Sequence, residues 1–163
     1  MSNITILAGA GRPIGPLGLI KLFGAQTSDA FSLVEHPLGP GRLLAPMHTH
    51  RHEDEYSFVL QGEIMAQIGN EVVTAPAGTL VLKPRGVPHT VWNATTRPAR
   101  ILEIISPAGF ENYFVELAEL LAQAGPPDVE RINMLAQEYG LEFDFSTLAE
   151  LSQTYDVSLG GAS

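Results

Sequence analysis

The sequence contains no cysteine. This absence excludes disulfide bonds and thiolate ligands, so any metal ion must be bound through nitrogen and oxygen atoms. A closed structural zinc site usually includes cysteine ligands. A metal site in this chain is therefore expected to differ from that kind and to keep coordination positions open.

Basic residues are scarce, because 9 lysines and arginines stand against 18 aspartates and glutamates, for a formal net charge of −9. A surface of this charge repels phosphate backbones, so we expect no nucleic-acid partner. No apolar run reaches the length of a membrane span, so we expect no membrane partner. The N-terminus lacks a basic region followed by a long apolar segment, so we expect no signal peptide and a cytoplasmic location.

Short apolar runs separated by glycine and proline fill the first 110 of the 163 residues. This pattern is typical of many short strands, as in a barrel or a sandwich. The dipeptide Gly69-Asn70 between two such runs predicts a hairpin turn. We expect strands at Leu19–Phe23, Ala30–His36, Leu43–His50, Glu55–Gln61, Ile64–Ile68, Glu71–Thr74, Thr79–Lys83, His89–Asn93 and Arg100–Ser106.

The pattern becomes helical after Ser106. Apolar residues recur at helical spacing between residues 110 and 121, and the Gly-Pro-Pro sequence at 125–127 ends that helix. Asp128 can cap a second helix that ends at Gly140, and a third short helix is expected to begin near Ser146. We expect this extension to pack on the rest of the same domain, since it is too short for a domain of its own.

Four residues carry chemistry: His48, His50, Glu55 and His89. Three imidazoles and one carboxylate are the ligand set that a single divalent transition metal prefers. His48 and His50 are two residues apart, so their side chains point to the same face of a strand. Four protein ligands around an octahedral ion leave two positions open for water, dioxygen or a chelating molecule. His52 continues the same alternation and is a rival ligand.

Ten positions in two motifs resemble those of the cupin superfamily. The first motif is met by Gly41, His48, His50, Glu55 and Gly62, with six residues rather than the usual five after the first glycine. The second is met without departure by Gly78, Pro84, Gly86, His89 and Asn93. So many positions in order are far more specific than a single glycine motif. The resemblance selects His48 and His50 over His52, which we expect in a solvated turn.

The resemblance implies an all-β fold, a small antiparallel barrel of the double-stranded jelly-roll kind with the metal inside it. On this reading residues 1–18 form an N-terminal coil or arm, residues 19–107 the barrel, and residues 108–163 a helical extension packed outside the barrel. It also implies one divalent transition metal, either Fe, Mn, Ni, Zn or Cu, held by His48, His50, Glu55 and His89. No internal repeat is present, so a single-barrel member is expected.

The chain is similar to monocupin dioxygenases of the quercetinase kind, which implies an oxidoreductase acting on an aromatic or chelating small molecule. On that analogy Glu55 is both a metal ligand and the catalytic base. The alternative is a non-catalytic cupin that binds a metal or a small ligand. A DNA-binding regulator is disfavoured, because the tail helices are acidic and follow the barrel. We expect a homodimer, because the strand face with Tyr56, Phe58 and Leu60 needs covering.

Other polar residues are expected to be structural or exposed. We expect His36 at the surface or rim, Glu53 and Asp54 in a solvated turn, and Glu103 facing solvent. Trp92 is expected to pack outside the barrel lumen, and Asn93 to form structural hydrogen bonds. The sequence shows no cluster of inward-facing lysines or arginines.

Overall fold

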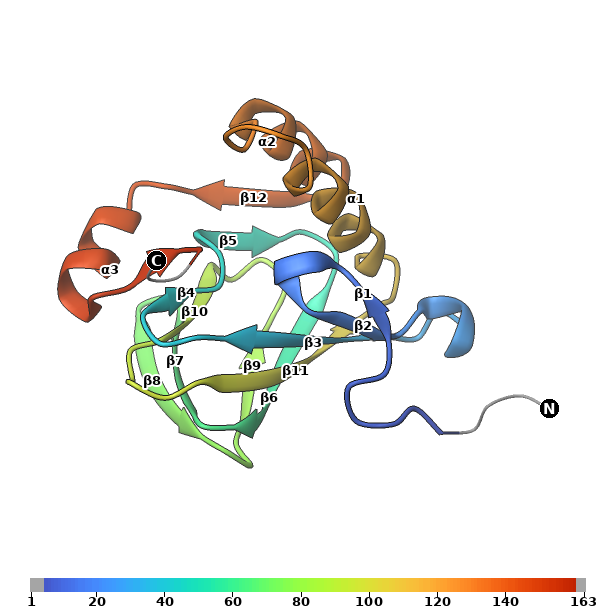
Figure 1. Ribbon diagram of the computed structural model, residues 1–163, viewed down its shortest axis with the longest axis horizontal. Coiled ribbons are helices and arrows are strands. Elements are labelled where there is room, and N and C mark those ends of the chain that lie inside the picture. The colour runs from blue at the N-terminus through green and yellow to red at the C-terminus, as the bar shows by residue number, and fades with distance from the viewer. Residues whose placement is uncertain (1–4, 161–163) are drawn as a thin grey trace.

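The computed structural model describes residues 5–160. The ends of the predicted arm and helical extension, residues 1–4 and 161–163, lie outside the described residues. Two sheets face each other across most of the molecule, and three helices lie in the C-terminal third of the sequence (Figure 1). None of the helices within residues 5–160 is both long and apolar enough to cross a membrane.

The first sheet has six strands in the spatial order β1-β2-β3-β11-β6-β9. All of its neighbouring strands pair antiparallel. Its strands are β1 (Arg12–Pro13), β2 (Leu19–Leu22), β3 (Ser32–Leu38), β11 (Ala99–Ser106), β6 (Asp54–Gln61) and β9 (Leu80–Lys83). Short 3-10 turns at Gly15–Leu17 and Gly24–Gln26 flank β2.

The second sheet runs β12-β5-β10-β4-β13, and β7 pairs with both β10 and β8. Within the described residues, its only parallel pair is β13 with β4. Its strands are β4 (Arg42–Leu43), β5 (Met47–His50), β7 (Glu63–Ile68), β8 (Glu71–Pro76), β10 (His89–Asn93), β12 (Leu141–Asp144) and β13 (Ser158–Leu159). The predicted strand Leu43–His50 is thus two strands, β4 and β5. The predicted hairpin is confirmed, since Ile68 and Glu71 pair across Gly69-Asn70.

The expected jelly-roll fold is confirmed, but its two facing sheets do not close into a barrel. No strand of one sheet pairs with a strand of the other within the described part of the chain. At one end, apolar side chains from both sheets pack together and fill the space between them. This core consists of Leu38, Val59, Ile64, Ala66, Ala75, Val81, Val91, Ala99 and Ile101. The other end is not filled in this way, and the polar residues of interest lie there.

The helices are α1 (Glu111–Leu121), α2 (Val129–Glu138) and α3 (Leu148–Tyr155). As predicted, Asp128 caps α2, because its side chain accepts a hydrogen bond from the Arg131 backbone N at 3.1 Å. Figure 1 shows α1 and α2 together beyond β5 and β12, whereas α3 lies beside β4 and β13.

Only α3 matches the expectation of helices packed outside the strands. Leu151 of α3 and Tyr155 cover the outer face of the second sheet, where they pack with Leu43 and the fully buried Trp92. The expected position of Trp92 is therefore confirmed. By contrast, α1 and α2 cover the unfilled end between the sheets, where their apolar side chains join Ile20, Val34 and Ile105 in a second core. These two helices pack over the opening, so they can shape whatever binds there.

Candidate metal centre

The structure brings His48, His50, Glu55 and His89 together, with one ligand atom from each lying within 4.8 Å of the others. His48 lies opposite His89 in the pairing of β5 with β10. Glu55 comes from the facing sheet, on β6. The turn at residues 51–53 takes the chain from one sheet to the other, which explains why the five-residue interval between His50 and Glu55 breaks simple strand alternation.

A tight turn before β10 places His89. Gly86 has φ of +73°, a conformation that residues with a side chain rarely adopt, and its backbone N donates to the His50 carbonyl at 2.8 Å. This bond ties the turn to the end of β5. The pattern of proline and glycine in the second motif therefore sets the distance between the two histidine-bearing strands.

Hydrogen bonds to the Nδ1 atoms orient the three imidazoles. The Nδ1 of His48 lies 2.7 Å from the Pro46 carbonyl, and that of His89 lies 3.0 Å from the Val87 carbonyl. Since a carbonyl only accepts, these two Nδ1 atoms donate, so the Nε2 atom of each ring is the one that can bind a metal. The Nδ1 of His50 lies 3.4 Å from Glu53 Oε2. A ligating histidine normally has such a partner on its other nitrogen.

Both oxygens of Glu55 face cationic or polar groups. Oε2 lies 3.0 Å from His89 Nε2 and 3.0 Å from Lys83 Nζ, and Oε1 lies 3.4 Å from His50 Nε2. Burial alone would raise the pKa of Glu55, but His50, Lys83 and His89 hold that pKa well below its usual range. The carboxyl group is therefore ionised, as a metal ligand must be.

Burial keeps the neighbouring imidazoles neutral. It lowers the pKa of His48 well below the ordinary value, and His89 and His50 lower it further. It also lowers the pKa of His89. A neutral imidazole is the form that binds a metal.

The donor set fits a divalent transition metal. Two ligand atoms on opposite sides of one ion, each at about 2.1 Å, lie about 4.2 Å apart, close to the 4.8 Å limit of this cluster. The three free Nε2 atoms and one ionised carboxylate supply nitrogen and oxygen donors of the expected kind. The cluster could therefore hold one metal ion after a contraction of a few tenths of an ångström.

A cavity of about 600 Å³ adjoins the cluster. His48, His50 and Glu55 line it, together with apolar side chains from α1, α2 and β12. The Phe110 ring packs edge-on against His50 with centroids 4.4 Å apart, and Phe143 lies 6.1 Å from His48. The aromatic lining includes Phe110, Tyr113, Phe114 and Phe143. Such a volume and lining suit a small, largely apolar molecule.

A buried charged pair beside the cluster contradicts one sequence-based expectation, that Glu103 faces solvent. Glu103, expected in solvent, is only 2% exposed, and Lys83 is an inward-facing lysine that is 3% exposed. Lys83 Nζ lies 2.8 Å from Glu103 Oε2, and the Ser57 hydroxyl donates to the same oxygen at 2.9 Å. Strand alternation could not reveal this, because both faces of β9 and β11 carry apolar residues at most positions.

Two further expectations are wrong. His36 is 2% exposed rather than at the surface, and its Nδ1 lies 2.6 Å from the Leu17 carbonyl. Burial lowers the pKa of His36 to about 4, although the bond to Leu17 opposes the change. Glu53, expected in a solvated turn, is buried against His50. His52 is exposed and lies outside the cluster, as expected.

Asn93 forms structural hydrogen bonds, as predicted. Its amide nitrogen donates to the carbonyls of Leu38 and Arg97, at 3.0 and 2.8 Å. Its side-chain oxygen accepts from Thr95.

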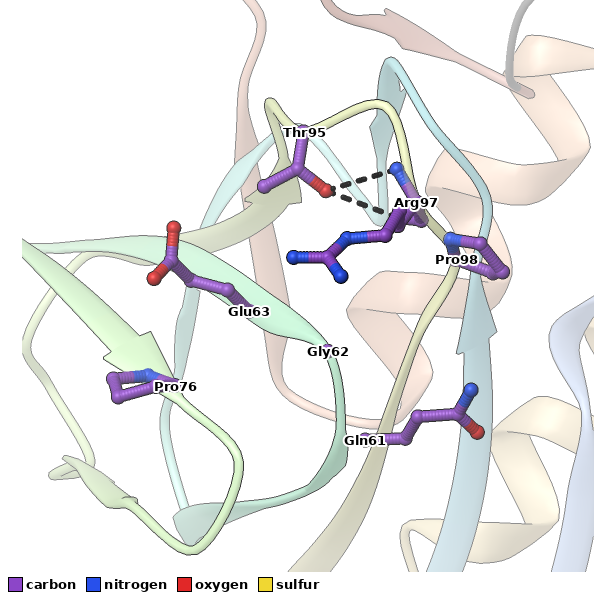
Figure 2. Close-up of a pocket in the computed structure, with 7 residues that line it drawn as sticks. All are labelled: Gln61, Gly62, Glu63, Pro76, Thr95, Arg97 and Pro98. Atoms are coloured by element: carbon purple, nitrogen blue, oxygen red, sulfur yellow. Dashed lines mark hydrogen bonds between the residues drawn. The ribbon is translucent and has the colours of Figure 1, made fainter.

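A second hollow, of about 430 Å³, lies away from the cluster (Figure 2). It is lined by Gln61, Gly62, Glu63, Pro76, Thr95, Arg97 and Pro98. Figure 2 shows the Thr95 hydroxyl bonded to the backbone of Arg97, so this polar group is already satisfied by the loop itself. None of the four candidate ligands lines this hollow.

In a comparison with known families, residues 35–105 match the family described as "Cupin domain". This segment includes all four residues of the cluster, whereas α1, α2 and β12 lie beyond it. No curated protein matches the chain.

Solved structures support the same fold. An uncharacterised conserved protein with a double-stranded β-helix domain from Klebsiella pneumoniae is 22% identical, with a TM-score of 0.55 over 67% of this chain and 93% of that one. A protein of Thermotoga maritima described as a predicted oxalate decarboxylase is 23% identical, with a TM-score of 0.51 over 55% of this chain and 77% of that one. At this level of identity the likeness shows the cupin fold alone.

Proposed function

We propose that this cupin is a metal-dependent oxidoreductase, of the quercetinase-like dioxygenase kind, that acts on an aromatic or otherwise chelating small molecule. The observation that carries the proposal is that three members of the four-donor cluster, His48, His50 and Glu55, line an otherwise largely apolar and aromatic cavity. A chelating molecule can place its oxygens toward the cluster and its apolar body against α1, α2 and β12.

In this proposal His48, His50, Glu55 and His89 hold one divalent transition metal. A bound metal would act as a Lewis acid and would lower the pKa of a hydroxyl group that binds it. The three histidines are oriented by their Nδ1 partners, so their contribution is to bind the metal. They leave proton transfer to the remaining ligand.

Glu55 is the residue proposed to accept the proton of a substrate hydroxyl. Its low pKa makes it a weak base toward an ordinary hydroxyl, but an acidified hydroxyl needs only a weak base. Of its two oxygens, Oε2 is shared by Lys83 and His89, whereas Oε1 has a single and longer contact, to His50. Oε1 is therefore the oxygen with more freedom to bind or accept.

The aromatic lining is proposed to position the substrate and to exclude water. Phe110 packs on both His50 and Tyr113, so the wall formed at the start of α1 touches the cluster directly. Excluding water strengthens electrostatic interactions inside the cavity. A substrate with an apolar body would complete this enclosure.

A non-catalytic metal- or ligand-binding cupin is the second candidate. It is favoured by the double engagement of Glu55 Oε2, because a carboxylate held by Lys83 and His89 is a poor proton acceptor. In that case ligands would bind and stabilise the protein without turnover.

Metal analysis and oxygen uptake separate the two candidates. The protein is stripped, reloaded separately with each candidate metal, and mixed with a panel of chelating aromatics, including 3-hydroxyflavone. Oxygen consumption that depends on metal and substrate supports the oxidoreductase. Ligand-induced thermal stabilisation without oxygen consumption for any metal supports the binding protein and rejects the enzyme.

We also propose that the protein is a homodimer that buries the outer face of β6 and β9. Phe58 and Leu80 pair across these strands and are 37% and 49% exposed, and Leu82 is 56% exposed. An apolar strip of this kind on a sheet favours association with a second copy of the chain.

A further inference from the structure

Lys83 is one of only two lysines in the chain, and it is buried inside the cavity. Removing an ammonium group from water costs several kcal/mol, and replacing a buried ion pair by apolar residues is often neutral or stabilising. The Nζ atom of the other lysine, Lys21, lies 3.6 Å from Glu35 Oε2, and Lys21 does not line the cavity. Packing alone therefore gives no reason for a charged pair at the position of Lys83.

The hydrogen bonds of Lys83 leave one donor available. An ammonium group has three N–H donors. Within residues 5–160, two acceptors lie within hydrogen-bond distance of Lys83 Nζ, namely Glu103 Oε2 at 2.8 Å and Glu55 Oε2 at 3.0 Å. Because Lys83 lines the cavity, the third N–H is available to an oxygen atom of a bound molecule.

Two carboxylates hold the ammonium group of Lys83 in place, since Glu103 Oε2 and Glu55 Oε2 both lie within 3.0 Å of Nζ. Ser57 donates to both oxygens of Glu103, at 3.2 and 2.9 Å, and so orients the carboxylate that holds the lysine. The cation therefore has a fixed place next to Glu55, within the candidate centre.

We propose that Lys83 is a ligand-binding residue that donates its third N–H to an anionic oxygen of the molecule bound at the metal centre, with Ser57 and Glu103 as its positioning residues. The proposal deepens the proposed function and rests on it. It narrows the ligand to chelators with a second anionic or strongly accepting oxygen, such as a carboxylate, an enolate or a phenolate, beside the oxygen that faces the metal.

The test removes the ion pair as a unit, in the double variant Lys83→Met with Glu103→Met. Wild type and variant are loaded with Co²⁺, whose visible spectrum reports ligand binding, and are titrated at pH 8 with two probes. Acetate is an oxyanion that can accept from Lys83. Imidazole is a neutral nitrogen ligand that needs an open metal position but no second donor. Lys21→Met, which breaks the pair with Glu35, is the matched control.

The double variant should fold with a melting temperature equal to or above that of wild type. Its acetate affinity should fall about 10- to 100-fold, the effect of losing a charge-assisted hydrogen bond, and its imidazole affinity should change less than about twofold. Lys21→Met should leave both affinities unchanged. If the double variant does not fold, Lys83→Gln, which keeps a neutral polar group between the carboxylates, is measured in its place.

The other outcomes overturn the proposal in distinguishable ways. Unchanged acetate affinity in the variant shows that Lys83 does not bind the ligand, while the proposed function stands. An equal loss for both probes shows that the pair acts only on the metal centre. If wild type binds metal but neither probe, the open coordination positions of the proposed function are wrong and the role of Lys83 falls with them.

Discussion

The buried histidine His36 provides a quantitative prediction about acid stability. Its ring is 2% exposed, its Nδ1 is bonded to the Leu17 carbonyl, and Phe114 packs edge-on at 5.1 Å between centroids. Protonation would place an imidazolium in this buried site. The positive charges of Lys83 and Arg42 also oppose that protonation. The perturbation is His36→Gln, which removes the titrating group and keeps a possible donor to Leu17.

The magnitude follows from the two pKa values. Burial lowers the pKa of His36 to about 4 from an ordinary value of 6.5. As pH falls below 6.5 the unfolded chain takes up a proton that the folded protein refuses until about pH 4. Stability from this residue is therefore fully present above pH 6.5 and is lost between pH 6.5 and 4. At about 1.4 kcal/mol per pKa unit the loss is about 3 kcal/mol.

The assay is urea unfolding of the metal-free protein at a series of pH values from 8 to 4. The quantity of interest is the free energy of unfolding of wild type minus that of His36→Gln, because the difference cancels the other titrating groups. This difference should fall by about 3 kcal/mol between pH 7.5 and 4. His52→Gln, at an exposed turn position, controls for the loss of an imidazole elsewhere. A difference that stays flat with pH would refute the burial argument.

Three further predictions address the candidate centre and the outer sheet face. His89→Ala should lower the metal content from about one ion per chain to below about 0.1, whereas His52→Ala should leave the metal content unchanged. Equal metal contents of the two variants by elemental analysis would remove His89 from the ligand set. Glu55→Gln should retain most of the metal but lose about 10²- to 10⁴-fold in turnover on the substrate that supports oxygen uptake, and full turnover would leave Glu55 with a binding role only. Leu82→Lys should convert the dimer to a monomer in light scattering at micromolar concentration, because it places a charge in the apolar strip; a wild-type protein that is already monomeric would contradict the dimer.

Much of the fold follows from local patterns in the sequence. Alternation and turn residues predicted β10 at His89–Asn93, the hairpin at Gly69-Asn70 and most of the other strands of the jelly roll. Helical spacing and the Asp128 cap predicted α1 and α2 to within about one residue. Strands β12 and β13 were missed, because each is only a few residues long and is stabilised by pairing with β5 or β4 rather than by its own composition.

The proximity of the four candidate ligands could be anticipated only in part from local patterns. Strand alternation places His48 and His50 on one face, whereas the resemblance to the cupin motifs is what brought Glu55 and His89 into the set. The charged group formed by Lys83 and Glu103 could not be anticipated. Both faces of β9 and β11 are largely apolar, so alternation does not say which face lies inside. The general preference of charged side chains for solvent would place Lys83 and Glu103 on the outer face, which is wrong.

The sequence by itself therefore determined most of the strands, the helices and the spacing of His48, His50, Glu55 and His89. Only the tertiary structure decided that α1 and α2 cover the open end of the jelly roll, that His36 is buried, and that Lys83 bridges Glu55 and Glu103. The physical reason is that periodicity reports which residues share a face of an element. What that face contacts depends on how distant elements pack, and the cost of burying a charge is offset only by partners far away in the sequence.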